Sequence, residues 1–167
     1  GIQTMTGTGL TAALFYALGY AAMSALCFLV VVEIGRDEDL VSIESLAGLH
    51  QRAPLLAATL MIGLFGLIGL PPTVGFIGKW FLFSAAIEQG QFVFVLVAAI
   101  NSAVALYYYL LVIRQAYFAE ETSDEPIHTG VVTLAVAGGT TGFVIAMGVV
   151  PGWFWALSVE AVVALMG

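Results

Sequence analysis

Charged residues are scarce in this 167-residue sequence, at 9% of the chain, against roughly a quarter in soluble domains. Hydrophobic residues make up 61% and the mean hydropathy is +1.06, so the chain lacks the polar groups that cover a soluble fold. Four basic residues against eleven acidic ones leave a net charge of −7, which excludes a phosphate-binding surface. The composition predicts a membrane protein.

Cysteine is nearly absent, because Cys27 is the one thiol of the chain and can form no internal disulfide. We expect it to be a small buried hydrophobe. His50 and His128 lie in polar loops, without partners spaced for a metal. The sequence therefore predicts no metal site and no redox centre, and it disfavours an intramembrane hydrolase. The start at Gly1, without Met or a basic leader, indicates a fragment, a processed product or part of a longer polypeptide.

Long apolar runs supply the fold prediction, since a helix needs about 20 apolar residues to cross a ~30 Å hydrocarbon core. We expect an all-α transmembrane helix bundle, in one domain over residues 1–167. It has about four spans, at 10–33, 53–88, 91–117 and 130–155. The second span is discontinuous near 70–76, because Pro71 and Pro72 cannot continue a helix and Gly75 and Gly78 weaken its restart.

An alternative topology turns residues 53–88 into two short spans. The arginines distinguish the two readings, since positive residues gather on the cytoplasmic side. With one broken span, Arg36, Arg52 and Arg114 flank the same membrane face, whereas two spans move Arg114 to the opposite face. The positive-inside rule therefore favours the broken span.

Small and aromatic residues indicate how the spans pack. Glycines at 19, 138, 139, 142 and 148 favour close helix contacts in lipid. Trp153 and Trp155 follow Pro151 and are typical of an interfacial aromatic belt. Residues 156–166 have the composition of a short interfacial helix.

Lys79 is the chain's single lysine, and it lies in a strongly apolar segment. If the second half-helix ends near Glu88, Lys79 lies about 14 Å inside it, near the membrane midplane. An ammonium group there is costly unless it is paired or hydrated, and irregular backbone at that depth must line a cavity. A broken helix beside a titratable residue predicts an ion pathway, with Lys79 as proton relay. The alternative is a lysine that reaches an interface from a helix end.

Five other polar residues within the expected spans are candidates for lining such a pathway: Asn101, Ser102, Tyr16, Tyr20 and Glu33. Asn101 and Ser102 also suit hydrogen bonds between helices, and the two tyrosines, four residues apart on one helical face, also suit packing. Glu33 ends the first span and could serve as a carboxylate at the mouth of the pathway.

Three segments carry a family resemblance: "LAGLHQRAPLLAATLMIGLFGLIGLPPTVGFIGKWFLFSAAIEQG", "NSAVALYYYLLVIR" and "LFYALGYAAMSALCFLVVV". Together they resemble the C-terminal third of the antiporter-like subunits of the proton-pumping NADH–quinone oxidoreductase (complex I), with subunit N the most similar. The same pattern occurs in subunits of cation/proton antiporters and membrane-bound hydrogenases. The resemblance extends over nearly the whole chain and is weakest after residue 120.

The resemblance implies that this chain supplies the last four of fourteen helices, which form two inverted repeats with one broken helix each. Lys79 matches the lysine on the second broken helix, which is thought to pass protons outward. The chain itself would then be a non-catalytic segment of a translocase in the bacterial inner membrane or an equivalent one. NADH, FMN, iron–sulfur clusters and quinone are expected in partner subunits of the same complex.

The sequence thus predicts part of a transmembrane proton half-channel, coupled to electron transfer elsewhere. Two rivals remain open at this stage. One is a subunit of a Na⁺/H⁺ antiporter or a membrane-bound hydrogenase on the same scaffold. The other is a purely structural membrane module, in which Lys79 lies at an interface.

Overall fold

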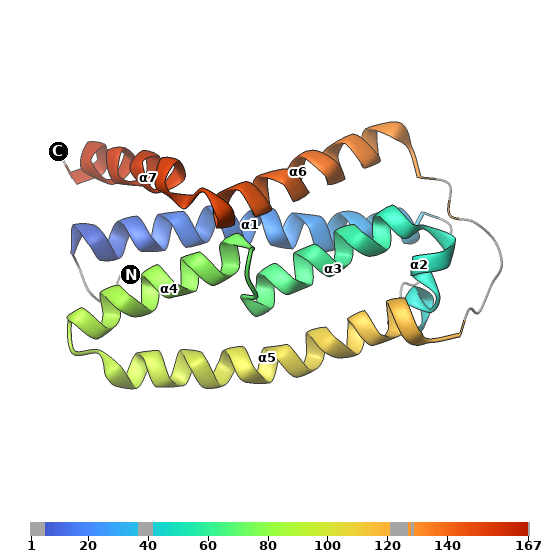
Figure 1. The fold of residues 1–167 in the computed structure, drawn as a ribbon, viewed down its shortest axis with the longest axis horizontal. Helices are drawn as coiled ribbons and strands as arrows, with labels where there is room; N and C mark the ends of the chain where they lie inside the picture. Colours follow the sequence, from blue (N-terminus) through green and yellow to red (C-terminus); the bar gives the residue numbers. More distant parts are fainter. Residues whose placement is uncertain (1–5, 37–41, 121–126, 128, 167) are drawn as a thin grey trace.

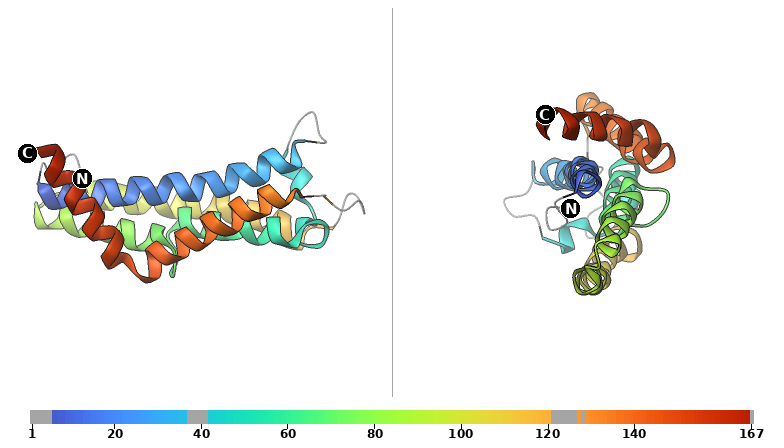
Figure 2. Two further views of the ribbon diagram at one scale, coloured as in Figure 1. Left: turned by 90° about the horizontal axis from the view of Figure 1, so that it is seen from above. Right: turned by 90° about the vertical axis from the view of Figure 1, so that its left-hand side faces the viewer.

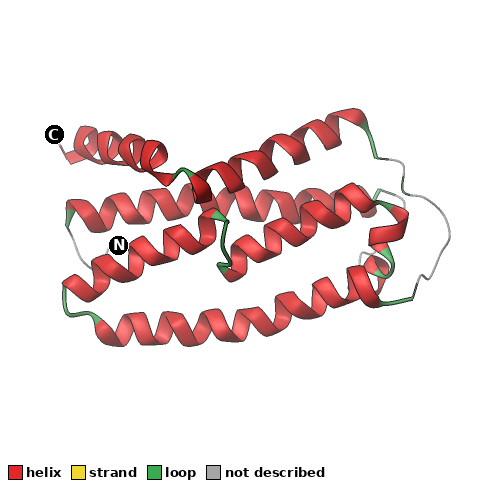
Figure 3. Ribbon diagram, viewed as in Figure 1, coloured by secondary structure: helices red, strands yellow, loops and turns green. Residues whose placement is uncertain are grey.

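The computed structural model describes residues 6–36, 42–120, 127 and 129–166, and within them every regular element is a helix. The prediction of an all-α fold is confirmed for these residues (Figures 1 and 3). The elements in chain order are α1 (Gly7–Ile34), the short 3-10 helix η2 (Glu44–Leu46), α2 (Leu49–Arg52), α3 (Pro54–Ile68), α4 (Val74–Glu88), α5 (Phe92–Phe118), α6 (Val131–Val149) and α7 (Pro151–Met166).

Three of the described helices are long and apolar enough to cross a membrane: α1, α5 and α6. The helices α3 and α4 have 15 residues each. They follow one another along the length of the bundle, next to the longer α1 and α5 (Figure 1). The non-helical residues 69–73 join them and contain a cis peptide bond between Pro71 and Pro72.

Helix α1 is the central element, and it packs against α3, α4, α6 and α7. Seen end-on, α3 and α4 lie between α5 on one side and α6 with α7 on the other (Figure 2). One core cluster gathers where α1, α2, α3 and α5 meet, around Val30, Leu49 and Ile113. A second cluster joins α1 to α4 and α6, around Met23, Val74 and Val144. Helix α1 therefore holds α3 and α4 together on both sides of their junction.

Two helices, α6 and the start of α7, cover the span expected at 130–155. Helix α6 ends at Val149, Val150 has non-helical angles (φ −123°, ψ 63°), and Pro151 begins α7. A proline lacks the N–H that would continue α6 and also disfavours a helical conformation in the preceding residue. Helix α7 then leaves at an angle to α6 (Figure 2). It begins before the expected interfacial helix at 156–166.

Close packing by small residues is present at some of the expected positions. A Cβ added to Gly19 would lie 2.6 Å from Val74 Cγ2, and one on Gly148 would collide with the carbonyl of Pro72. Gly138, Gly139 and Gly142 have open space around their Cα atoms. Among these glycines of α6, Gly148 in the last turn is therefore the one that lets another part of the described chain approach closely.

His50 is not the solvated loop residue that the sequence predicts. It belongs to α2, its Nδ1 lies 3.2 Å from the carbonyl oxygen of Ala116, and its ring stacks on Tyr117. The ring is partly buried because α2 packs against α5 at this end of the bundle. His128 lies outside the described residues.

Candidate functional site

The C-terminal end of α3 has carbonyl groups that its own helix cannot satisfy, as every helix end does. Gly69, at φ +92°, turns the chain away, and the N–H groups of Gly69 and Leu70 both donate to the Phe65 carbonyl, at 3.0 and 2.9 Å. The carbonyls of Leu67 and Ile68 lie beyond this turn. They are acceptors that need a donor from outside the helix.

Lys79 of α4 supplies that donor. Its Nζ lies 3.1 Å from the Leu67 oxygen and 2.8 Å from the Ile68 oxygen. Side chains of a helix lean toward its N-terminus, so a residue in the second turn of α4 reaches back to the end of α3. The partly buried amine thus lies at the negative end of the α3 dipole, where a cation is favoured.

Ser102 of α5 completes this site. Its Oγ lies 3.2 Å from Lys79 Nζ, and its side chain is partly buried. The three oxygens around the amine therefore come from α3 and α5, while the lysine comes from α4. No acidic side chain of the described residues forms an ion pair with Lys79, so its partners within them are dipoles.

Glycines allow the backbone to approach closely around Lys79. A Cβ on Gly75 would collide with the carbonyl of Gly66, so α4 begins in contact with the backbone of α3. A Cβ on Gly78 would lie 2.8 Å from Tyr16 Cδ2, and one on Gly69 would lie 3.1 Å from Lys79 Cδ. Side chains at these positions would push α1, α3 and α4 apart.

The other candidates from the sequence lie at different distances from this site. Tyr16 packs beside Gly78, and its ring centroid is 6.0 Å from that of Tyr20. Tyr20 is 49% exposed, and Asn101 faces outward as well. Pro71 and Pro72 are exposed at the junction. The structure thus brings Lys79 and Ser102 together, places Tyr16 nearby, and turns Asn101 and Tyr20 outward.

Glu33 lies in the last turn of α1, in a separate polar cluster. Its carboxylate pairs with Arg36 Nη1 at 3.1 Å and accepts hydrogen bonds from the Thr133 hydroxyl at 3.1 Å and the Gly130 N–H at 3.4 Å. The side chain is 2% exposed. The partners from α6 were not predicted from the sequence, because about 100 residues separate them from Glu33.

The backbone partners of Lys79 were also missed. Leu67 and Ile68 carry apolar side chains, so residue identity contains no sign of their role. The sequence does contain one signal for these contacts. Gly69 is expected to end a helix, whose last carbonyls then need donors, and Lys79 follows ten residues later.

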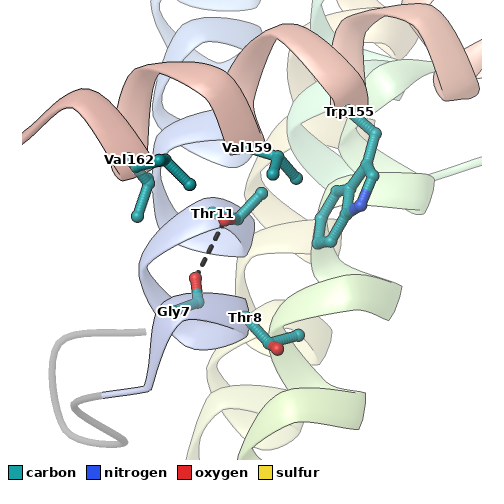
Figure 4. A pocket seen from close by; sticks show the side chains of 7 residues that line it. Gly7, Thr8, Thr11, Trp155, Val159 and Val162 are labelled. Carbon is teal, nitrogen blue, oxygen red and sulfur yellow. Dashed lines mark hydrogen bonds between the residues drawn. The ribbon is translucent and has the colours of Figure 1, made fainter. Parts of the chain in front are cut away.

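A cavity lies away from Lys79, between the start of α1 and α7 (Figure 4). Its volume is about 630 Å³, and it is lined by Gly7, Thr8, Thr11, Trp155, Val159, Val162 and Val163. The Thr11 hydroxyl donates to the Gly7 carbonyl at 2.8 Å and is therefore occupied by its own helix. The described lining residues carry no charge. This cavity contains none of the chemistry of the lysine site.

No cluster of three or more potential metal ligands is present among the described residues. The same residues hold one thiol, Cys27. It packs against α3, where a Cβ on Gly63 would lie 2.8 Å from its Sγ.

Comparison with known proteins provides a family assignment. The family model described as "NADH:quinone oxidoreductase/Mrp antiporter, TM" matches residues 1–105. NADH-quinone oxidoreductase subunit N 2 of Syntrophobacter fumaroxidans is 48% identical over 126 residues, which are 75% of this chain and 27% of the relative. The same subunit of Solidesulfovibrio magneticus is 40% identical over 162 residues, 96% of this chain and 34% of the relative. This chain therefore spans about a quarter to a third of these relatives' length.

Two solved structures share the fold. Respiratory complex I from Thermus thermophilus with bound aureothin contains a chain that matches with a TM-score of 0.78 and 30% identity, over 88% of this chain and 34% of that one. The Mrp complex from Dietzia sp. DQ12-45-1b matches with a TM-score of 0.83 and 23% identity, over 95% of this chain and 38% of that one. The second likeness concerns the fold alone.

Proposed function

Because this chain belongs to the NADH:quinone oxidoreductase/Mrp antiporter transmembrane family, as its sequence pattern predicts, we propose that it forms part of a proton half-channel with Lys79 as relay. The chain is an integral membrane component, in the inner membrane of bacteria as in its relatives. The strongest support for the relay is the position of Lys79 Nζ, within 3.2 Å of three oxygens at a helix break.

In the proposed topology, α3 and α4 together make one discontinuous span. Each has 15 residues and is about 22 Å long, which is shorter than the ~30 Å hydrocarbon core. Joined end to end along α1, they are long enough to cross. With α1, α5 and α6 they give four spans, and the break made by Pro71, Pro72 and Gly75 lies within the bilayer. The ends of α1 and α5 that carry Arg36 and Arg114 then share the cytoplasmic face.

The lysine site suits reversible protonation. The charged amine has three donors for three oxygens, so its desolvation is compensated without a permanent counter-ion. A carboxylate partner would hold the proton more tightly than the neutral carbonyl and hydroxyl groups do. Irregular backbone at this depth exposes polar groups that water can reach, as a proton pathway requires.

The pumping activity belongs to a larger assembly in this proposal. Electron transfer between NADH and quinone, with FMN and iron–sulfur clusters, takes place in partner subunits, and this chain couples to it by moving protons. A Na⁺/H⁺ antiporter subunit is the second candidate, favoured by the fold shared with the Mrp complex. A lysine relay carries protons in both cases. A purely structural module is disfavoured, because Lys79 turns toward the junction between α3 and α4 and not toward the far end of α4 at Glu88.

Proton pumping by the whole complex in liposomes tests the relay with Lys79→Ala and Lys79→Arg. We expect both variants to lose most redox-driven pumping, because alanine has no proton to carry and arginine keeps its charge but does not release it. The neighbouring Trp80, which is 63% exposed, provides the control Trp80→Leu, which is expected to pump normally.

Assembly of each variant is checked by native electrophoresis before transport is measured. If Lys79→Ala and Lys79→Arg assemble and pump at the unaltered rate, the relay is wrong and the chain is a scaffold. The antiporter candidate takes precedence if the unaltered complex exchanges sodium for protons without electron transfer and the Lys79 variants lose this exchange.

A further inference from the structure

The three oxygens around Lys79 differ in what they can do with a proton. Backbone carbonyls, such as those of Leu67 and Ile68, only accept hydrogen bonds, whereas the Ser102 hydroxyl can accept or donate. A charged amine has three N–H donors, and the structure supplies one oxygen for each. In the charged state every donor is therefore paired.

A neutral amine at the same position has two N–H donors and one lone pair. The two carbonyls each still accept one of these N–H donors, because a carbonyl oxygen can only accept a hydrogen bond. The lone pair then faces the remaining partner, and Ser102 can rotate its O–H to donate to it. Ser102 is thus the one contact of Lys79 that stays paired in both charge states by reversing its role.

Other titratable groups near Lys79 do not offer this exchange. Helix α4 packs against α1, α3, α5 and α6. Helices α3 and α6 contain no titratable side chain. On α1 the neighbour is Tyr16, whose ring packs against Gly78 and whose described contacts include no hydrogen bond to Lys79. On α5 the contact with Lys79 is made by Ser102 itself.

We propose that Ser102 is the proton-exchange partner of Lys79, an inference that rests on the proposed relay function. In the release step one Nζ–H bond breaks and a new Oγ–H bond forms on Ser102. The original hydroxyl proton of Ser102 passes to a water molecule on its other side, which becomes hydronium and hands the proton onward. Loading runs the same sequence in reverse. The serine ends each step neutral, and one proton moves.

The proposal makes α5 part of the pathway. This helix is otherwise the most outward-facing of the three long helices, with none of its most apolar stretch buried in this chain. Ser102 is a polar residue in an apolar stretch, and it turns inward toward α4. The two α3 carbonyls only accept hydrogen bonds and cannot take the proton from Lys79. The Ser102 hydroxyl can take it and pass a proton on, away from α3.

Ser102→Ala and Ser102→Thr in the whole complex, reconstituted in liposomes, test the proposal. We expect Ser102→Ala to lower the pumping rate roughly 100-fold, the lower range for a positioned proton-transfer group. Ser102→Thr keeps the hydroxyl and is expected to restore pumping. The matched control is Ser158→Ala on α7, since that buried hydroxyl donates to the Phe154 carbonyl of its own helix and has no part in the relay.

Pumping in heavy water adds a readout that packing alone does not change. The residual pumping of Ser102→Ala should show a solvent isotope effect different from that of the unaltered complex, because its rate-limiting proton transfer differs. Ser102→Cys, nearly the same size and a poor hydrogen-bond partner, provides a second variant if the alanine form does not assemble, and it should pump as slowly.

Normal pumping by Ser102→Ala, with Lys79→Ala inactive, would overturn the exchange role and leave the relay intact. Loss of pumping in both Ser102→Ala and Ser102→Thr, with Ser158→Ala normal, would also overturn it, because side-chain shape and not the hydroxyl would then matter. If Lys79→Ala itself pumps normally, the relay fails and the exchange role fails with it.

Discussion

The carboxylate of Glu33, in the last turn of α1, accepts a hydrogen bond from the hydroxyl of Thr133, in the first turn of α6, at 3.1 Å. The same carboxylate accepts the N–H of Gly130, which precedes α6, and pairs with Arg36. A carboxylate near the first turn of a helix satisfies its free N–H groups and interacts favourably with its dipole. Glu33 therefore fastens the start of α6 to the end of α1.

Glu33→Ala is expected to destabilise the chain by about 1–3 kcal/mol, because the hydrogen bonds of the Thr133 hydroxyl and the Gly130 N–H to a buried carboxylate are lost, and bonds to a charged group contribute more than neutral ones. Arg36→Ala should cost less than about 1 kcal/mol, since the arginine side chain is 57% exposed and exposed ion pairs contribute little. The measurement is the fraction of this chain that stays soluble after heating in detergent, detected by immunoblot. Equal losses for the two variants would show that the ion pair, and not the link to α6, carries the stability.

Gly75→Ala tests the close contact between α3 and α4. The added Cβ would collide with the Gly66 carbonyl, a backbone atom that cannot rotate away, so α4 must shift from α3. Overpacking of this kind typically costs 1–3 kcal/mol, and the shift would also move Lys79 from the Leu67 and Ile68 carbonyls. We expect lower thermal stability together with reduced pumping.

Gly138→Ala is the matched control for that variant. Gly138 also lies within a helix, but nothing approaches the position of its Cβ within 4 Å in this chain. Alanine is favoured over glycine in a helix by about 1 kcal/mol, so stability should stay equal or rise. If both glycine variants behave alike, the close approach at Gly75 is not what holds the junction together.

The helical fold and the non-helical junction at residues 69–73 could be predicted from local signals. The two adjacent prolines, the glycines after them and the length of the apolar runs each act within a few residues of the chain. The polar character of Lys79 and Ser102 in apolar surroundings was also visible in the sequence. Their contact was not, because the distance between them depends on how α4 and α5 are rotated about their axes.

The end of α6 follows from a local signal. Pro151 starts a new helix and disfavours the helical conformation at Val150. The contacts of Glu33 could not be predicted from its neighbours in the sequence. Gly130 and Thr133 are about 100 residues away, and the residues around Glu33 do not indicate which helix it contacts.

Trp155 and Trp153 are expected to respond differently to substitution, although the sequence assigns both to one aromatic belt. The ring centroid of Trp155 lies 4.3 Å from that of Phe81 and 6.2 Å from that of Phe15, so it joins α7 to α4 and α1. Trp153 is 64% exposed. Trp155→Ala should lower stability by about 2 kcal/mol, less than the 3–5 kcal/mol of a fully buried ring, whereas Trp153→Ala should change it little.

Heat stability in detergent measures this difference, with each variant compared with its phenylalanine counterpart. Trp155→Phe keeps an aromatic ring and should recover part of the loss. A greater loss for Trp153→Ala than for Trp155→Ala would contradict the packing of α7 against α1 and α4.

The topology of residues 53–88 can be decided by labelling single cysteines in a Cys27→Ala background. A broken single span places Glu44 and Glu120 on one membrane face and Gln89 on the other, because α3 and α4 cross the bilayer once between them. All three positions are exposed, so a membrane-impermeant maleimide can reach each from its own side. In inverted and right-side-out vesicles, we expect Glu44→Cys and Glu120→Cys to react from the same side and Gln89→Cys from the opposite one. Two separate spans would instead place Gln89 with Glu44 and move Glu120 across, and that pattern would exclude a lysine at a mid-membrane break.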